Sequence, residues 1–301
     1  MTEAFVSVII PVYNDPERLE TCLDALERQS YPTDAYEVIA VDNNSDESIE
    51  GIVDMFPHAV SAFEANQGSY AARNRGIQVA HGGILAFTDA DCIPASDWIE
   101  TGVRRLEGED SGVGIVGGEI EMTFQDPDAP KPAEILDAMT GFDQKAVCTK
   151  RNFSATANLF TFRHVIEDVG NFDDRLKSAG DKEFGHRVVR NGYRIAYEPE
   201  AIVRHPARDS PRALFKKRVR LAKGQYDLRV TRDAYSLPEL LVDSIKHLMP
   251  IPKYTSKILN DPRFVSPIDR LRAVLIYVIM ELIFPFEKIR LWIRNDTPEN
   301  V

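Results

Sequence analysis

The chain has 301 residues, 44% of them hydrophobic and 28% charged, which is a soluble globular composition long enough for one large domain with an appendage or for two ordinary domains. Its formal net charge of −11 argues against nucleic acid as a partner. The charge is uneven, because residues 1–203 carry 17 Lys and Arg against 36 Asp and Glu, whereas residues 204–301 carry 19 against 11.

Strand and helix patterns alternate over the first 91 residues. Apolar runs predict buried strands, since strands of a parallel sheet are almost continuously hydrophobic. These runs cover residues 5–13, 36–41, 60–65 and 84–88. Helix signals between them predict helices that begin at Pro16, near Glu47 and near Ser69. The alternation predicts an α/β fold with a mostly parallel sheet flanked by helices.

Polar residues follow each predicted strand. The clusters are Tyr13-Asn14, Asp42-Asn43-Asn44-Ser45, Asn66-Gln67-Gly68 and Asp89-Ala90-Asp91. Ligands of open α/β sheets bind at the carboxyl ends of the strands, so four such clusters favour a binding crevice over four unrelated turns. The chain contains neither the glycine-rich dinucleotide fingerprint nor a P-loop.

The last cluster carries two carboxylates one residue apart. In an extended chain this spacing places Asp89 and Asp91 on the same side. Two oxygen ligands on one side suit a divalent cation that also grips substrate phosphates. An acidic turn without a metal is the alternative.

Four segments, taken together in this order and spacing, resemble family 2 glycosyltransferases, which are nucleotide-sugar enzymes with the GT-A fold. The segments are residues 7–14, 38–45, 66–76 and 87–91, and the resemblance extends over about residues 5–205. It implies a metal-dependent inverting glycosyltransferase that uses Mn2+ or Mg2+. The donor would be a nucleoside-diphosphate sugar, with UDP-sugar favoured, and the acceptor a hydroxyl of a saccharide or lipid-linked molecule.

The resemblance assigns the donor site residue by residue. Pro11, Tyr13 and Asp42 correspond to nucleobase and ribose contacts, with Asn14 and Asn44 beside them. A carboxylate at position 42 can accept a hydrogen bond from the imino N–H of uracil or guanine. The two asparagines after Asp42 depart from the family's usual Asp-Asp or Asp-Gly, which weakens any inference about the base.

Further donor contacts are implied by the third and fourth segments. Asn66, Gly68 and Arg73 lie where the family holds the ribose and diphosphate, although Arg73 would alternatively be an exposed cation on its helix. Asp91 corresponds to the direct metal ligand, and Asp89 to the residue that contacts the metal site, ribose or donor sugar.

The following segments complete the predicted catalytic domain. The sequence predicts, in this order, a helix from about Pro94 to Leu106, a glycine-rich strand at 111–120, a rigid linker at 125–132 and a helix to about Ala146. Asn158 corresponds to a contact with the donor or acceptor sugar, with a structural amide as the alternative. The resemblance implies that His205 completes the metal shell or touches the diphosphate, with a histidine that is not a ligand as the alternative.

The general base is expected in the segment that begins at Ser178. The family has an acidic pair opening a helix here. Asp181 takes the position of the base, Glu183 is the second catalytic candidate, and Gly180 stands where the family often has Glu. An inverting transfer needs one carboxylate to accept the proton of the attacking hydroxyl. The alternative for both acids is simple complementation of the helix dipole.

The sequence predicts a GT-A domain at 1–207, with a nucleotide-sugar half to about 120 and an acceptor half at 121–207, followed by a basic, mainly helical extension at 208–301. The apolar stretch 271–286 is interrupted by Arg272 and Glu281 and is too short and too charged to predict a membrane span. We expect it to lie at an anionic membrane surface, or to pack against the catalytic domain or a second subunit.

Two alternatives to glycosyl transfer are a nucleotide-sugar binding protein of the same fold and a nucleotidyltransferase. The loop after the first strand is neither glycine-rich nor basic, which argues against the second, and the presence of Asp91 and Asp181 argues against the first. Three widely spaced cysteines without a C-x-x-C pair argue against a zinc site and for a reducing compartment. With no basic segment at the N-terminus, we expect a cytoplasmic protein, with a peripheral position at the inner face of the membrane as a variant.

Overall fold

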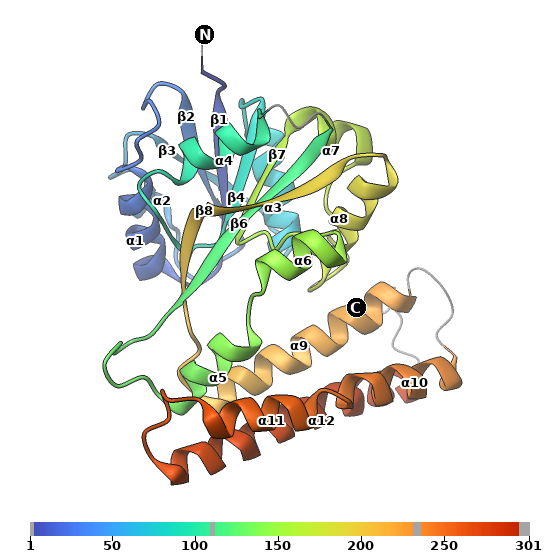
Figure 1. The fold of residues 1–301 in the computed structure, drawn as a ribbon. Coiled ribbons are helices and arrows are strands. Elements are labelled where there is room, and N and C mark those ends of the chain that lie inside the picture. The colour runs from blue at the N-terminus through green and yellow to red at the C-terminus, as the bar shows by residue number, and fades with distance from the viewer. Residues whose placement is uncertain (1–2, 109–111, 231–235, 295–301) are drawn as a thin grey trace. The chain divides into compact units, whose positions relative to one another are not determined.

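The computed structural model describes residues 3–108, 112–230 and 236–294. The chain forms two compact units (Figure 1). The first unit consists of Met1–Glu121, Phe142–Asp174 and Gly180–His205, and the second of Met122–Gly141, Arg175–Ala179 and Pro206–Val301.

Strands and helices alternate through the first part of unit 1, as predicted. The order is β1 (Val6–Val12), α1 (Pro16–Leu26), β2 (Tyr36–Asp42), α2 (Glu50–Val53), β3 (Ala59–Phe63), α3 (Ser69–Val79) and β4 (Ile84–Thr88). Strands β1 and β4 are buried along their whole length, which explains their unbroken apolar sequences. Helix α2 is shorter than the predicted helix.

The rest of unit 1 adds strands of mixed direction. Its elements are β5 (Ile93–Pro94), α4 (Trp98–Leu106), β6 (Val113–Thr123), α6 (Gln144–Arg151), β7 (Asn158–Phe162), α7 (Arg163–Val169), α8 (Gly180–Arg190) and β8 (Arg194–Pro206). All strands form one sheet in the order β3-β2-β1-β4-β7-β6-β8-β5. Neighbours from β3 to β4 are parallel, whereas β7 runs antiparallel to both β4 and β6. The predicted α/β fold is confirmed.

The parallel half of the sheet brings the polar clusters to one edge. Val12 of β1 is paired with Asp42 of β2, and Asp42 is paired with Phe63 of β3. Strand β4 runs alongside β1 in the same direction. The loops that follow these four strands therefore leave the same edge of the sheet.

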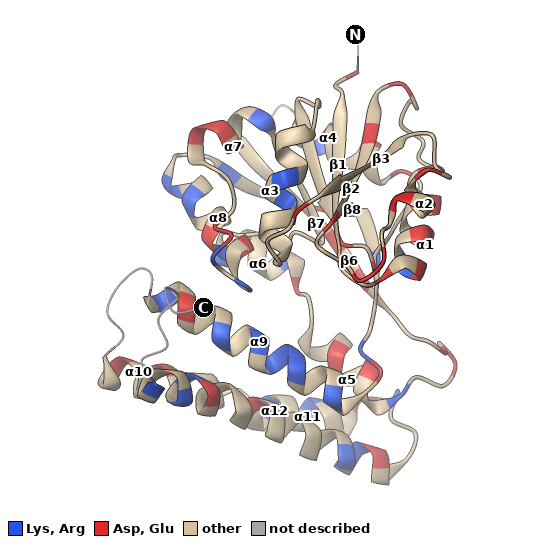
Figure 2. Cartoon of the chain, turned by 180° about the vertical axis from the view of Figure 1, so that it is seen from behind, with Lys and Arg blue, Asp and Glu red and all other residues tan. Residues whose placement is uncertain are grey.

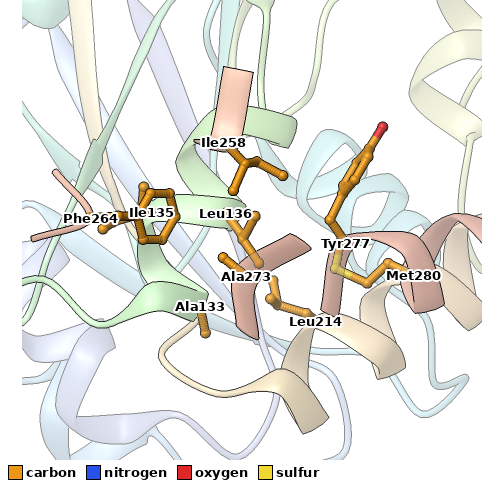
Figure 3. Close-up of a cluster of buried hydrophobic side chains, with 9 residues drawn as sticks. All are labelled: Ala133, Ile135, Leu136, Leu214, Ile258, Phe264, Ala273, Tyr277 and Met280. Carbon is orange, nitrogen blue, oxygen red and sulfur yellow. The ribbon is translucent and has the colours of Figure 1, made fainter. Parts of the chain in front are cut away.

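Unit 2 contains α5 (Pro132–Thr140), α9 (Pro211–Val230), α10 (Leu237–Leu248), α11 (Ile251–Asn260) and α12 (Pro267–Arg294). Helix α12 packs against each of the other four. Figure 3 shows a core cluster to which α5, α9, α11 and α12 contribute, and which consists of Ala133, Ile135, Leu136, Leu214, Ile258, Phe264, Ala273, Tyr277 and Met280. Among the described residues, no helix combines the length and apolar character needed to cross a bilayer.

The predicted single helix up to about Ala146 is wrong. The chain leaves α5 at Gly141, and a new helix begins after Asp143, whose carboxylate accepts a hydrogen bond from the backbone N–H of Ala146 at 3.0 Å. An Asp cap of this kind satisfies an otherwise unpaired N–H of the first turn. This cap was not predicted from the sequence, and the two helices belong to different units.

Buried ion pairs hold α5 and α9 together within unit 2. Asp137 is fully buried, and its carboxylate pairs with Lys217 at 2.7 Å and Arg208 at 3.2 Å. The nearby Lys217 ammonium lowers the pKa of Asp137 despite its burial. Part of the basic run that begins at Arg208 thus serves inside the unit and is not a solvated face.

The packing of α4 on β7 yields a stability prediction. A Cβ added at Gly102 would lie 2.3 Å from the ring of Phe160, so Gly102→Ala should destabilise the fold by about 1–3 kcal/mol through overpacking. Gly51 in α2 is the matched control, because nothing lies within 4 Å of its added Cβ. Gly51→Ala should be neutral or stabilise by up to about 1 kcal/mol. Urea unfolding of both variants measures the difference, and equal stabilities would contradict the close packing.

Candidate active site

The loops after β1 and β2 are tied to each other by side-chain amides and carboxylates. The Asn14 amide donates to Asp46 at 3.0 Å and accepts from the Asp46 N–H at 2.8 Å. Asn14 and Asn44 adopt φ values of 51° and 63°, which Asn tolerates better than most residues. Asn14 therefore fixes the loop after β1 against the loop after β2. The neighbouring Tyr13 is 52% exposed.

Asp42 lies at the end of β2, where a hollow opens at the edge of the sheet. Its side chain is only 8% exposed and accepts a hydrogen bond from the Ser45 N–H at 2.9 Å. The hollow measures about 320 Å³, within the range of small-molecule sites. Its lining consists of Asp42, Ser45, Ser48, Ile49, Glu50, Ser61, Ala62 and Phe63.

Asn43 organises the next loop, a role that the sequence analysis missed. Its buried amide donates to the carbonyls of Glu64 and Asn66, at 3.2 and 2.8 Å, and accepts from the N–H of Gly68 at 2.6 Å. Gly68 has a φ of 152°, which disfavours any side chain there. An amide can satisfy donors and acceptors at once, so an Asn directly after a buried strand was the available signal.

Arg73 lies on α3 and pairs with Asp89 at the end of β4. The Arg73 side chain is 4% exposed and that of Asp89 is 31% exposed. The alternative of an exposed helix cation is therefore wrong. The guanidinium also lies 5.6 Å from the centroid of the Tyr70 ring, and its Nε has no hydrogen-bond partner among the described residues.

Asp91, in the loop after β4, lies close to His205, near the end of β8. Asp91 Oδ2 lies 3.7 Å from His205 Nε2, and the His205 ring packs against Phe142 at 5.2 Å between centroids. These ligand atoms and the Cys92 thiol all lie within 4.8 Å of one another. A carboxylate and an imidazole suit Mn2+, whereas a thiol is a soft ligand that suits it poorly. The donor set formed by Asp91 and His205 fits a divalent cation.

Asp181 stands at the first turn of α8, in contact with Tyr70 of α3. Its backbone N–H donates to the Tyr70 hydroxyl at 3.2 Å, and that hydroxyl donates to Asp181 Oδ1 at 3.5 Å. Burial, with the Asp181 charge second, raises the pKa of the Tyr70 phenol. Gly180 allows this contact, because a Cβ there would lie 2.6 Å from the Tyr70 ring.

Glu183 forms an ion pair with Arg187 one turn further along α8, at 2.8 Å. The Arg187 guanidinium also donates to the carbonyls of Gly170 and Asn171, both at 2.8 Å. Its interactions fix the turn after α7 against α8. Of the two candidate acids, Glu183 is committed to this pair, and Asp181 faces Tyr70.

Asn158 has the structural role of the two alternatives considered for it. Its side chain is fully buried, its amide donates to the carbonyls of Glu119 and Ala201 at 2.7 and 2.8 Å, and it accepts from Trp98 Nε1 at 2.9 Å. These bonds lock neighbouring strands of the antiparallel half of the sheet. The alternative prediction, a contact with the donor or acceptor sugar, does not fit the structure, because no surface of this side chain is exposed.

A comparison with known families matches residues 7–170 to the model described as Glycosyl transferase family 2. The chain belongs to this family. Glycosyltransferase AglE of Haloferax volcanii is 43% identical over 229 residues, which are 74% of each chain. A dolichyl N-acetyl-alpha-D-glucosaminyl phosphate 3-beta-D-2,3-diacetamido-2,3-dideoxy-beta-D-glucuronosyltransferase of Methanococcus voltae is 22% identical over 227 residues, which are 71% of each chain.

A solved structure supports the fold. The mannosyltransferase PcManGT from Pyrobaculum calidifontis, in complex with GDP-Man and Mn2+, superposes with a TM-score of 0.67 at 20% identity and covers 98% of this chain and 88% of that one. The GT-A fold, the family and the assignment as a glycosyltransferase are thus confirmed. The family and the names of the relatives favour glycosyl transfer over the two alternatives, a binding protein and a nucleotidyltransferase.

The Arg73–Asp89 pair predicts an asymmetry between its two partners. Asp89→Ala leaves a buried guanidinium without its counter-charge and should cost about 3–5 kcal/mol of stability. Arg73→Met leaves a carboxylate that water can reach, and should cost less, about 1–3 kcal/mol. Urea unfolding of the two variants tests the order, and a larger loss for Arg73→Met would show that the pair is wrongly assigned.

Proposed function

We propose that the chain is a metal-dependent inverting glycosyltransferase that transfers a sugar from a nucleoside-diphosphate sugar to a hydroxyl of a saccharide or lipid-linked acceptor. One observation carries the proposal. Contacts lead without a break from Asp181 through Tyr70 and Arg73 to Asp89, next to the Asp91–His205 pair. A carboxylate able to act as a base is thereby held in a fixed relation to residues able to hold a metal.

The donor nucleoside is proposed to enter the hollow beside Asp42. The carboxylate there can accept from an imino N–H of uracil or guanine, and the exposed Tyr13 and Phe63 offer apolar surface to a base. UDP remains the favoured nucleotide, and GDP is the second candidate because PcManGT was solved with GDP-Man. Asn66 and Gly68, in the loop held by Asn43, would then flank the ribose and diphosphate.

Asp91 and His205 would hold the cation, for which Mn2+ or Mg2+ is proposed. When bound, the ion supplies positive charge for the oxygens of the leaving diphosphate. Asp89 was predicted either to belong to the metal site or to contact the ribose or donor sugar, and its pairing with Arg73 supports the second role. We propose that this pair faces the ribose or donor sugar.

Asp181 is proposed to be the general base. It would take the proton of the acceptor hydroxyl while that oxygen forms a bond to the anomeric carbon. The bond to the diphosphate oxygen breaks on the opposite face, and the diphosphate leaves with the electron pair, so the configuration inverts. Tyr70 orients the Asp181 carboxylate and stays protonated, since burial and the carboxylate raise its pKa. Glu183 is retained as a residue that positions α8 through Arg187.

The reducing compartment also belongs to the proposal. Cys22, Cys92 and Cys148 are all buried as free thiols. Burial raises the pKa of Cys148 to about 11, so this thiol is unreactive at neutral pH. The unpaired state of the three cysteines supports the proposed cytoplasmic position.

The metal assignment predicts that Asp91→Ala weakens Mn2+-dependent nucleotide binding at least tenfold, because the variant removes the charged ligand of the proposed pair. Calorimetry with UDP, GDP and dTDP, each with and without Mn2+, measures this effect and identifies the base. Asp97→Ala is the control, since this exposed carboxylate lies a few residues further along the chain. Equal Mn2+-dependent affinity in the Asp91→Ala and native proteins would overturn the assignment.

The base assignment predicts that Asp181→Asn lowers kcat by about 10²–10⁴-fold, while the affinity for the nucleotide identified by calorimetry stays within twofold. Release of nucleoside diphosphate in the presence of free-sugar and polyprenyl-phosphate acceptors measures the rate. Asp174→Asn, at an exposed position of the same unit, is the control and should keep the native rate. Native turnover by Asp181→Asn would contradict the proposed role.

A further inference from the structure

The helices of unit 2 expose far more apolar surface than the rest of the described chain. Large apolar side chains are exposed at 21 described positions, and 14 of these lie between Leu237 and Ile293. Helix α12 contributes Ile268, Leu271, Leu275, Ile279, Leu282, Phe286 and Ile293, and α10 contributes Leu237, Leu241, Val242 and Ile245. An apolar surface of this extent marks an interaction site.

The exposed residues of α12 form one stripe. They recur at intervals of three, four and seven residues, which places them on a single face of the helix. The buried residues Ala273, Tyr277, Met280 and Phe284 follow the same spacing on the opposite face, toward the other helices of unit 2. Helix α12 is therefore apolar on two sides, and helices of this kind are normally covered all round.

The exposed charged residues of segment 236–294 are mostly cations. The exposed basic residues of segment 236–294 are Lys246, Lys253, Lys257, Arg263, Arg272 and Arg294. The acids with side chains exposed to a similar extent are fewer, and they are Glu239, Asp243 and Asp269. Figure 2 shows Lys and Arg on several of the helices in this unit. Basic side chains beside an apolar helix face match an anionic lipid surface, where the cations contact headgroups and the apolar side chains enter the acyl boundary.

We propose that the exposed faces of α10 and α12 bind an anionic lipid bilayer, with α12 lying in the plane of the membrane surface. This surface is independent of the donor and metal assignments. The proposed attachment is peripheral, with the apolar face of α12 buried at the headgroup boundary. A second copy of the chain fits less well, because a symmetric contact would bring basic residues of one sign together.

Flotation of the full chain with vesicles of half phosphatidylglycerol and half phosphatidylcholine tests the proposal. We expect binding that weakens at least tenfold on pure phosphatidylcholine vesicles and falls with rising salt. Leu271→Gln with Leu275→Gln should reduce binding at least tenfold, since both side chains are more than 60% exposed. Met55→Gln with Val60→Gln is the matched control in unit 1 and should bind as the native chain does.

A second variant makes the test independent of the apolar substitutions. Lys246→Gln, Lys253→Gln and Lys257→Gln together should weaken binding to the anionic vesicles and remove most of its salt dependence. The proposal is overturned if the native chain does not float with anionic vesicles, or if both sets of variants bind as it does. It is also overturned if light scattering shows a dimer that the Leu271→Gln and Leu275→Gln changes dissociate and vesicles do not bind, because the stripe would then be a subunit interface.

Discussion

The buried guanidinium of Arg73 is the charge on which the site depends. An arginine stays protonated in a protein, so a nearly inaccessible one requires a counter-charge, and Asp89 supplies it. The pair fixes α3 against the end of β4. Because Tyr70 lies one turn earlier on α3, the same helix also contacts Asp181 on α8. Helix α3 thus connects the end of β4 to the proposed base Asp181. The charge of Asp89 is neutralised by Arg73, while Asp91 lies beside His205.

The sequence predicted most of the fold because its signals are local. Apolar runs and helix starts gave β1 to β4 with their helices, and polar clusters after the strands located the edge of the site. Apart from the break between α5 and α6, which a local Asp143 cap produces, the errors concern side chains that act over distance. Asn158 carries no local sign that it bonds Trp98 and two carbonyls, and the burial of Arg73 depends on Asp89, 16 residues away. Position 43 belonged to a recognised cluster, but its amide bonds reach residues 64–68, a contact that spacing cannot specify.

Unit 2 combines an apolar core with two departures from the usual distribution of polar and apolar groups. Its interior holds the Asp137 carboxylate with Lys217, and Glu281 with Arg218, while its helices present leucine and isoleucine outward. A helix with apolar residues on two sides gives no clear period in the sequence, which is why the stretch 271–286 allowed several interpretations. The structure shows which side is used internally. A buried ion pair adds little stability compared with an apolar contact of the same size, but it restricts which helices can pack together. We infer that the ion pairs specify the helix packing in unit 2, because apolar side chains lie on both sides of α12 and do not by themselves select one side for the interior.

The contact between Gly180 and Tyr70 has an evolutionary consequence. The ring occupies the volume that a side chain at position 180 would fill, so the two positions share one space in this backbone. A relative with glutamate at the position of Gly180 cannot keep a tyrosine at that of Tyr70 without turning the tyrosine ring or moving α3 or α8. The two positions should therefore covary across the family, so that a larger side chain at position 180 on α8 accompanies a smaller one at position 70 on α3. A larger residue at position 180 should therefore be selected against wherever position 70 is still a tyrosine.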